Sequence, residues 1–247
     1  MNKKKLLNII DAKKRGEEKE ETLLQFLSTD LFIDLNNIKL LLHINQNTNA
    51  YTLLRRLTAR RYLIKHIIQL PTGKIPIWGI TQAGLQTLPI STTISPRPFE
   101  ASKITFTSIN HRLMIQRTRI YLQKKNWTNW KAGDSHQFKQ DYKSIKCRPD
   151  AIVTSPKTVT FALEIELTLK TSLRYRTIIK SHIEAIEKKH WAHVIYVVNT
   201  NNDKAHLTRR LENIDYIPIG ETRVPFSRYR NYISIFTIDE MQKLTHD

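Results

Sequence analysis

Three acidic side chains, spaced along two neighbouring apolar runs, could form a metal site. Asp150 follows Pro149 and opens the first run, and Glu164 and Glu166 lie two residues apart in the second. Alternate side chains of a strand point to one face, so the two glutamates share a face. A turn at 155–157 would pair the runs as a hairpin and bring Asp150 beside them. Oxygen ligands in this arrangement favour Mg²⁺ or Mn²⁺, which can activate water for attack on a phosphate.

Two further side chains could take part in this chemistry. Lys170 follows the second run and is a candidate to contact the phosphate or the attacking water. His111 lies in a predicted helix over 107–125, and an imidazole suits proton transfer or the orientation of a metal ligand. A bland alternative exists for each feature. Strand glutamates that face solvent produce the same alternation, and a lone helix histidine is usually structural.

The charge balance indicates a negatively charged partner. Lysine and arginine total 40 against 22 aspartate and glutamate, a formal net charge of +18. From Leu35 to Gly133 the only acidic residue is Glu100. Such a single-sign field attracts nucleic acid, which we favour over an anionic membrane surface. A single cysteine, Cys147, excludes an internal disulfide and a multi-cysteine zinc site. With no membrane-length apolar run and no signal peptide, we expect a cytoplasmic protein.

The elements that precede these residues predict a DNA-binding domain. Residues 1–19 are charged and predicted to be flexible, and residues 20–90 follow the order helix, helix, helix, hairpin. The hairpin strands, 62–70 and 75–80, flank a turn at 71–74. This order resembles bacterial winged helix-turn-helix domains, in which a recognition helix enters the major groove and a basic wing contacts phosphates. The candidate DNA contacts are Asn49, Thr52, Arg55, Arg56, Arg60, Arg61, Lys65 and Lys74. An individual arginine could equally be a solvated charge at a helix end.

A proline-rich linker is predicted at 91–102, before a second domain at 103–247. Helical spacing over 173–189, an apolar run over 192–198 and a helix from residue 203 indicate an α/β core with a mixed sheet. The fold class predicted for the whole chain is therefore α+β. Basic residues near a DNA channel would include Arg174, Arg176, Lys180, Arg209 and Arg210.

The acidic residues resemble the site of the PD-(D/E)XK nuclease superfamily, in which an aspartate after proline is followed one strand later by Glu-x-Lys. The sequence gives Pro149-Asp150 and then Glu164-Ile165-Glu166. Glutamate replaces the lysine at the last position, which leaves Lys170 or Lys180 as the substitute.

The combination of His111, a tryptophan-containing segment, Arg148-Pro149-Asp150-Ala151 and Glu-x-Glu after a winged helix resembles the replication-relaxation group and MOBC-type plasmid relaxases. That resemblance implies a bacterial, plasmid-encoded endonuclease that makes a site- and strand-specific nick, dependent on Mg²⁺ or Mn²⁺, to start conjugative mobilisation. Its implied partners are double-stranded or locally melted DNA at a transfer origin and other relaxosome or coupling proteins. The implied catalytic residues are Asp150, Glu164, Glu166, Lys170 and His111, with the three carboxylates as metal ligands.

Two other classes of function remain open. A non-enzymatic relaxosome accessory or replication-associated protein could bind the same DNA while a degenerate nuclease fold contacts DNA or partners. Glu166 in place of lysine keeps this alternative to the enzyme open. A transcription regulator with a ligand-sensing domain fits the N-terminal half but gives no reason for the three carboxylates to share a face. Better-known relaxases use a His-hydrophobe-His triad and a catalytic tyrosine, but no His-x-His occurs here and nothing selects one tyrosine.

Overall fold

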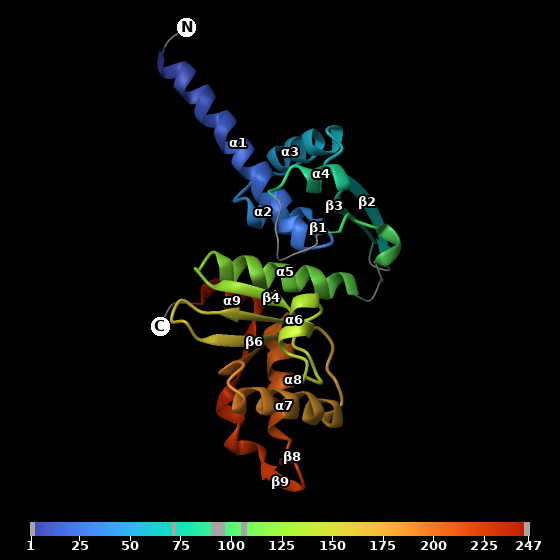
Figure 1. The fold of residues 1–247 in the computed structure, drawn as a ribbon, viewed down its shortest axis with the longest axis vertical. Helices are drawn as coiled ribbons and strands as arrows, with labels where there is room; N and C mark the ends of the chain where they lie inside the picture. Colours follow the sequence, from blue (N-terminus) through green and yellow to red (C-terminus); the bar gives the residue numbers. More distant parts are fainter. Residues whose placement is uncertain (1–2, 71–72, 90–96, 105–107, 245–247) are drawn as a thin grey trace. The chain divides into compact units, whose positions relative to one another are not determined.

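The protein is described by a computed structural model covering residues 3–70, 73–89, 97–104 and 108–244 (Figure 1). The chain divides into two compact units, Met1–Arg117 and Thr118–Asp247. Both combine helices with strands, which confirms the α+β class predicted from the sequence. Within the described residues, no helix combines the length and apolar character needed to cross a membrane.

The first unit has helices around a three-stranded antiparallel sheet with strand order β1-β3-β2. The predicted helices and hairpin of this half are present. Pro71 and Thr72 of the predicted turn lie outside the described residues. The elements are α1 (Lys3–Thr29), β1 (Ile33–Asp34), α2 (Leu35–Leu41), α3 (Asn47–Ala59), β2 (Leu63–Leu70), β3 (Gly73–Ile80), α4 (Gln82–Gln86), η1 (Ala101–Lys103) and the first part of α5 (Ile109–Gln123).

The N-terminal segment differs from the flexible terminus predicted over 1–19, because α1 begins at Lys3. Lysine, glutamate and leucine favour helix, and Gly16 is the one glycine in this stretch. Lys13 and Glu17 lie 4.0 Å apart, one turn from each other. The other end of α1 buries Leu23 and Leu27 in the core of the unit. Packing at this end supplies the stability that a lone helix lacks.

The predicted linker falls inside the first unit, although residues 91–96 lie outside those described. Residues 97–104 return to the sheet of this unit. The Phe99 amide donates to the Ile80 carbonyl at 2.8 Å, and a Cβ added to Gly79 would lie 2.2 Å from the Phe99 ring. Phe99 and Ile104 also pack against buried Ile109. Residues 97–104 therefore pack onto the first unit.

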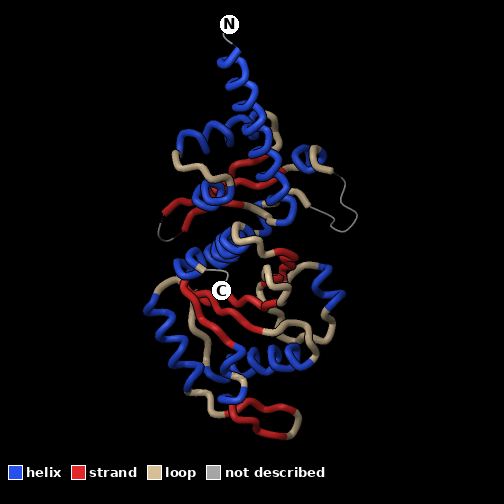
Figure 2. The backbone as a smooth tube through the Cα atoms, turned by 90° about the vertical axis from the view of Figure 1, so that its left-hand side faces the viewer, coloured by secondary structure: helices blue, strands red, loops and turns tan. Residues whose placement is uncertain are grey.

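The second unit is built on a five-stranded mixed sheet with strand order β10-β7-β6-β5-β4 (Figure 2). β4, β5 and β6 form an antiparallel meander, and β6, β7 and β10 run parallel. The elements are the end of α5, β4 (Thr128–Ala132), α6 (His136–Asp141), β5 (Ala151–Thr154), β6 (Thr160–Glu166), α7 (Ser172–Glu187), β7 (His193–Val198), α8 (Asn201–Glu212), β8 (Tyr216–Ile219), β9 (Thr222–Pro225), η3 (Phe226–Arg228), η4 (Arg230–Tyr232), β10 (Ile233–Thr237) and α9 (Ile238–Lys243).

Helix α7 carries the chain from β6 to β7, and its apolar face closes the core of the second unit. Tyr175, Ile179 and Ile183 of α7 are buried together with Ala162 of β6 and Val194 of β7. The predicted helix at 173–189 and strand at 192–198 correspond to α7 and β7. Side chains of α7 therefore meet the end of β6, where the acidic residues lie.

Candidate functional site

The β5–β6 hairpin brings Asp150 opposite Glu164, as the sequence predicts. Ala151 pairs with Leu163, so Asp150 falls across from Glu164 one step further along the same register. The Asp150 amide donates to the Leu163 carbonyl at 2.9 Å, and Asp150 Oδ2 accepts from the Ile165 amide at 2.7 Å. The amide and the side chain of Asp150 are thus both held by the backbone of β6.

Glu164 is held by a histidine that lies far from it in the sequence. Glu164 Oε1 lies 2.9 Å from Nε2 of His182, which projects from α7 and is 1% exposed. Burial raises the pKa of Glu164, the hydrogen bond and charge of His182 lower it, and the Asp150 charge raises it again. The Lys170 charge lowers it. The Glu164 side chain is 12% exposed, and burial has the largest effect on its pKa, followed by the hydrogen bond from His182.

Glu166 is engaged by two donors. Lys170 Nζ lies 2.5 Å and the Tyr175 hydroxyl 2.9 Å from Glu166 Oε2. The Lys170 amide also donates to the Tyr175 hydroxyl oxygen at 3.2 Å. The Glu166 side chain is only 3% exposed. The two glutamates therefore do not face solvent, and the simple reading of a half-exposed strand is wrong.

Tyr196 adds a buried hydroxyl to the same neighbourhood. It pairs in register with Glu164 across the parallel strands β6 and β7. Burial raises the pKa of Tyr196, and Glu164, Glu166 and Asp150 raise it further. Its hydroxyl has no hydrogen-bond partner among the described residues. Tyr175 and Tyr196 are both at most 1% exposed, so neither hydroxyl lies on the surface.

The donor types suit a divalent metal, since Mg²⁺ and Mn²⁺ take carboxylate and other oxygen ligands. Asp150 and Glu164 supply facing carboxylates, and the buried Tyr196 hydroxyl beside them has an unmet hydrogen-bonding capacity. Glu166 is committed to Lys170 and Tyr175. Across the described ranges, no three His, Cys, Asp or Glu side chains are placed to hold one ion. The arrangement fits a metal bound through two carboxylates, with the third in another role.

The remaining catalytic candidates separate in the structure. Lys170 pairs with Glu166, whereas Lys180 lies on α7 and pairs with Glu184 at 3.9 Å. Of the two substitutes for the motif lysine, the structure brings Lys170 to the site. His111 belongs to α5 in the first unit, whereas the carboxylate site is described within the second unit alone. A catalytic role for His111 stays a prediction.

The sequence analysis did not identify His182 and Tyr175 as site residues. Both lie in the apolar pattern of α7, where a polar ring resembles an ordinary core position. Their one signal is spacing. Seven residues separate them, which is two helical turns, so both face the same side of α7. This spacing, in a helix that follows two strand glutamates, is the pattern that indicates a histidine and a tyrosine as partners of those glutamates.

The predicted DNA contacts lie on α3, in the connection that follows it and on the β2–β3 hairpin, and all of them are exposed. Ala50, Leu53, Leu54 and Leu57 form the buried stripe of α3, as predicted. Arg55 lies on the exposed side and bonds only within its own helix, Nε to the Tyr51 carbonyl at 3.4 Å. The full set is Asn49, Thr52, Arg55, Arg56, Arg60, Arg61, Lys65 and Lys74.

Two of these arginines are tied to α1. Glu20 forms ion pairs with Arg56 Nε and with Arg60 Nη1, the second at 3.0 Å. The Glu20 side chain is 12% exposed, so these pairs are partly shielded from solvent. Arg55 has no ion pair among the described residues. The α3 arginines therefore differ in how readily they could reach a phosphate.

Comparison with known proteins gives one match, to the family described as replication-relaxation, over residues 24–189. No curated protein and no solved structure matches the chain. The matched segment is more than half of the chain and includes α3, the β5–β6 hairpin and α7. The protein belongs to the replication-relaxation family.

Proposed function

We propose that the protein is a DNA relaxase that makes a divalent-metal-dependent, site- and strand-specific nick at a plasmid transfer origin. Family membership indicates a role in replication or relaxation of DNA. The observation that supports cleavage is the grouping at the end of the β5–β6 hairpin, where Asp150 lies opposite Glu164 and Lys170 pairs with the neighbouring Glu166. Two facing carboxylates and a lysine are a chemically suitable set for phosphodiester cleavage.

In this proposal Asp150 and Glu164 hold the metal, which when bound would supply an activated water and stabilise charge on the phosphate. His182 fixes the orientation of Glu164. Lys170 stands in for the lysine that Glu166 replaces in the motif, and Glu166 holds it through their ion pair. The side chain of Glu166 could bind metal only after releasing Lys170 and Tyr175.

A buried tyrosine is poorly suited to attack DNA in this site. Burial raises the pKa of Tyr175 and of Tyr196, so both hydroxyls resist ionisation. Both are also shielded from a strand outside the protein. We therefore favour water as the nucleophile, which would leave no covalent protein–DNA adduct.

The first unit would recognise the DNA. Its order of elements, the β1-β3-β2 sheet and the exposed basic hairpin support the winged-helix reading. The meander β4-β5-β6 followed by the α7 crossover to β7 supports the restriction-endonuclease-like reading of the second unit. In this proposal Arg55 contacts a phosphate directly, whereas Arg56 and Arg60 must first leave Glu20.

A nicking assay on supercoiled plasmid with and without a transfer origin tests the proposal, because one cut relaxes a whole circle. With Mg²⁺ or Mn²⁺, Asp150→Asn and Glu164→Gln should each lower nicking by more than about a hundredfold. That loss exceeds the effect usual for residues that only hydrogen-bond to a metal ligand. Glu184→Gln is a matched control, because Glu184 lies on α7 and its ion pair in the described residues is with Lys180, away from the carboxylate site. DNA binding should persist in all three variants.

The apo stability of the variants gives a second readout. The raised pKa of Glu164 means that its buried charge is unfavourable, so Glu164→Gln should melt at an equal or higher temperature without metal. Full nicking by both carboxylate variants would overturn the proposal. Wild-type protein that binds DNA but never nicks it would favour the non-enzymatic accessory function.

A further inference from the structure

A pair of arginines around Tyr216 lies apart from the carboxylate site. Arg176 of α7 and Arg223 of β9 each place the guanidinium carbon 4.7 Å from the centroid of the Tyr216 ring. We call these three residues the Tyr216 cluster. Tyr216 and Arg223 belong to the β8–β9 hairpin at the red end of the chain (Figure 1) and lie beyond the residues matched by the family.

The geometry fixes two positive charges against one ring. The negative face of an aromatic ring attracts a guanidinium, and a stacked guanidinium loses little freedom when it then binds a ligand. In the hairpin, Pro218 pairs with Arg223 and Tyr216 with Pro225, so Tyr216 and Arg223 share a face of the ribbon. α7 packs against β8 and brings Arg176 to the same ring.

Neither guanidinium is neutralised within the described part of the chain. Among the residues that the structure describes, no ion pair joins Arg176 or Arg223 to a carboxylate, although Asp215 and Glu221 belong to the same region. Arg176 Nε is buried and has no acceptor among these residues. An arginine offers five donors in a planar fork that matches a phosphate. The cluster therefore holds two cations that no carboxylate of the described residues neutralises, and one of them, Arg223, is exposed.

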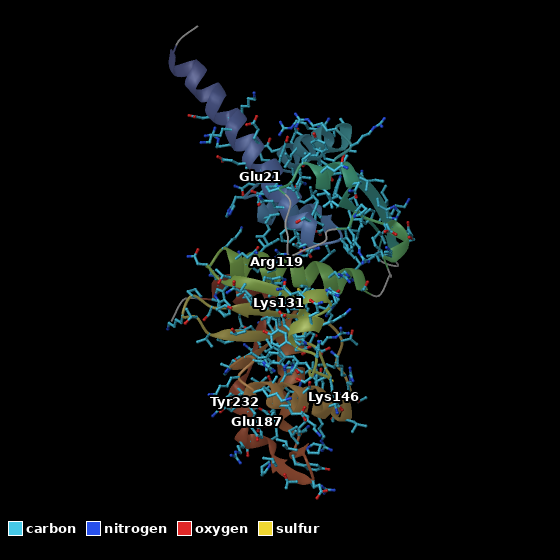
Figure 3. The ribbon with its side chains drawn as sticks, in the orientation of Figure 1. Glu21, Arg119, Lys131, Lys146, Glu187 and Tyr232 are labelled. Atoms are coloured by element: carbon cyan, nitrogen blue, oxygen red, sulfur yellow. The ribbon has the colours of Figure 1, made fainter. Side chains whose placement is uncertain are left out.

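A neighbouring pair shows the contrast. The Arg228 guanidinium lies 6.0 Å from the Tyr229 ring, and the Tyr229 hydroxyl donates to Glu187 at 3.4 Å (Figure 3 labels Glu187). Tyr229 thus has one arginine at its ring and a glutamate at its hydroxyl, whereas Tyr216 has two arginines at its ring. Arg228 is exposed, like Arg223. It provides a matched control for loss of one surface cation.

We propose that the Tyr216 cluster binds the phosphate backbone of DNA and forms a nucleic-acid contact of the second unit. This inference rests on DNA being the partner, as in the proposed function, but not on cleavage. Arg176 directly follows Tyr175, whose hydroxyl contacts Glu166. In this proposal α7 therefore carries, at adjacent positions, a residue that contacts the carboxylate site and a residue that contacts the DNA phosphate backbone.

The test is DNA binding by the full chain in EDTA, which removes cleavage, measured by fluorescence anisotropy across a salt series. The double variant Arg176→Ala and Arg223→Ala should bind several-fold more weakly. The magnitude of the negative slope of log affinity against log salt should fall by about 1 for each arginine removed. Tyr216→Leu should weaken binding, and Tyr216→Phe should preserve it because the ring remains. Arg228→Ala should lower the slope by less than Arg223→Ala.

Several outcomes distinguish this site from its alternatives. Equal affinity and salt slope for wild type, Tyr216→Leu and Arg223→Ala would overturn the proposal. Arg223 is exposed, so its single variant remains informative if Arg176→Ala fails to fold. Inorganic phosphate at equal ionic strength should displace DNA weakly, and tight binding of phosphate alone would overturn the assignment to a DNA backbone. Loss of DNA affinity in these variants alongside a wild type that never nicks would support this site while refuting the proposed nuclease function.

Discussion

Removing the hydroxyl of Tyr175, which donates a hydrogen bond to Glu166, should destabilise the protein, whereas removing the unpartnered hydroxyl of the nearby Tyr196 should not. Tyr175→Phe keeps the ring and removes only the hydroxyl, so it creates little cavity. That hydroxyl donates to Glu166 at 2.9 Å and accepts from the Lys170 amide at 3.2 Å. The change therefore leaves a buried carboxylate with one donor fewer and loosens the segment that carries Lys170.

The expected cost follows from the charge and burial of the partner. A hydrogen bond to a charged group contributes about 1.5–3 kcal/mol to the free energy of unfolding. In a unit of this size that corresponds to a fall of roughly 5–12 °C in melting temperature. Tyr196→Phe is the matched control, because the Tyr196 hydroxyl is buried without a partner in the described residues. Removing that hydroxyl should leave the melting temperature unchanged or raise it.

Calorimetry of both variants measures the difference, and hydrogen exchange of α7 peptides assigns it to the second unit. Tyr175→Phe should speed exchange near the start of α7, lower nicking through Lys170 and leave DNA binding intact. If Tyr196→Phe costs as much stability as Tyr175→Phe, or if Tyr175→Phe costs none, the assignment of the Glu166 partners is wrong.

Three further outcomes are expected. Arg55→Ala should lower the salt slope of DNA binding by about 1, and Arg56→Ala by less because Arg56 is paired with Glu20; equal slopes in an anisotropy titration would contradict this. Gly133→Ala should lower both melting temperature and nicking, because its Cβ would lie 1.8 Å from the Pro149 carbonyl oxygen, just before Asp150; unchanged melting and activity would exclude this close approach. Burial lowers the pKa of His193 below its usual 6.5, so the folded state binds fewer protons. Stability should therefore fall as pH drops below 6.5 toward the folded pKa, and a His193→Gln variant with the same pH dependence of melting would argue against this.

The local elements could be read from the sequence because their periods are local. Alternation with period two and a short turn were enough to predict that Asp150, Glu164 and Glu166 share one hairpin face, and the described hairpin has that register. The apolar stripe of α3 and the β2–β3 hairpin were predicted in the same way. The N-terminal segment was the exception. Its residue types favour helix, but it lacks the apolar periodicity on which the prediction depended, because only the far end of α1 packs against the core.

Partnerships between distant residues were decided only by the tertiary structure. Spacing could not choose between Lys170 and Lys180, because both are separated from Glu166 by a turn whose path depends on how α7 docks on the sheet. The same docking gives Glu164 its buried histidine partner. Glu20 and Arg56 likewise meet only when α1 packs beside α3. Sequence patterns fix the face on which a side chain lies, whereas packing decides which opposite charge or hydrogen-bond donor meets it there.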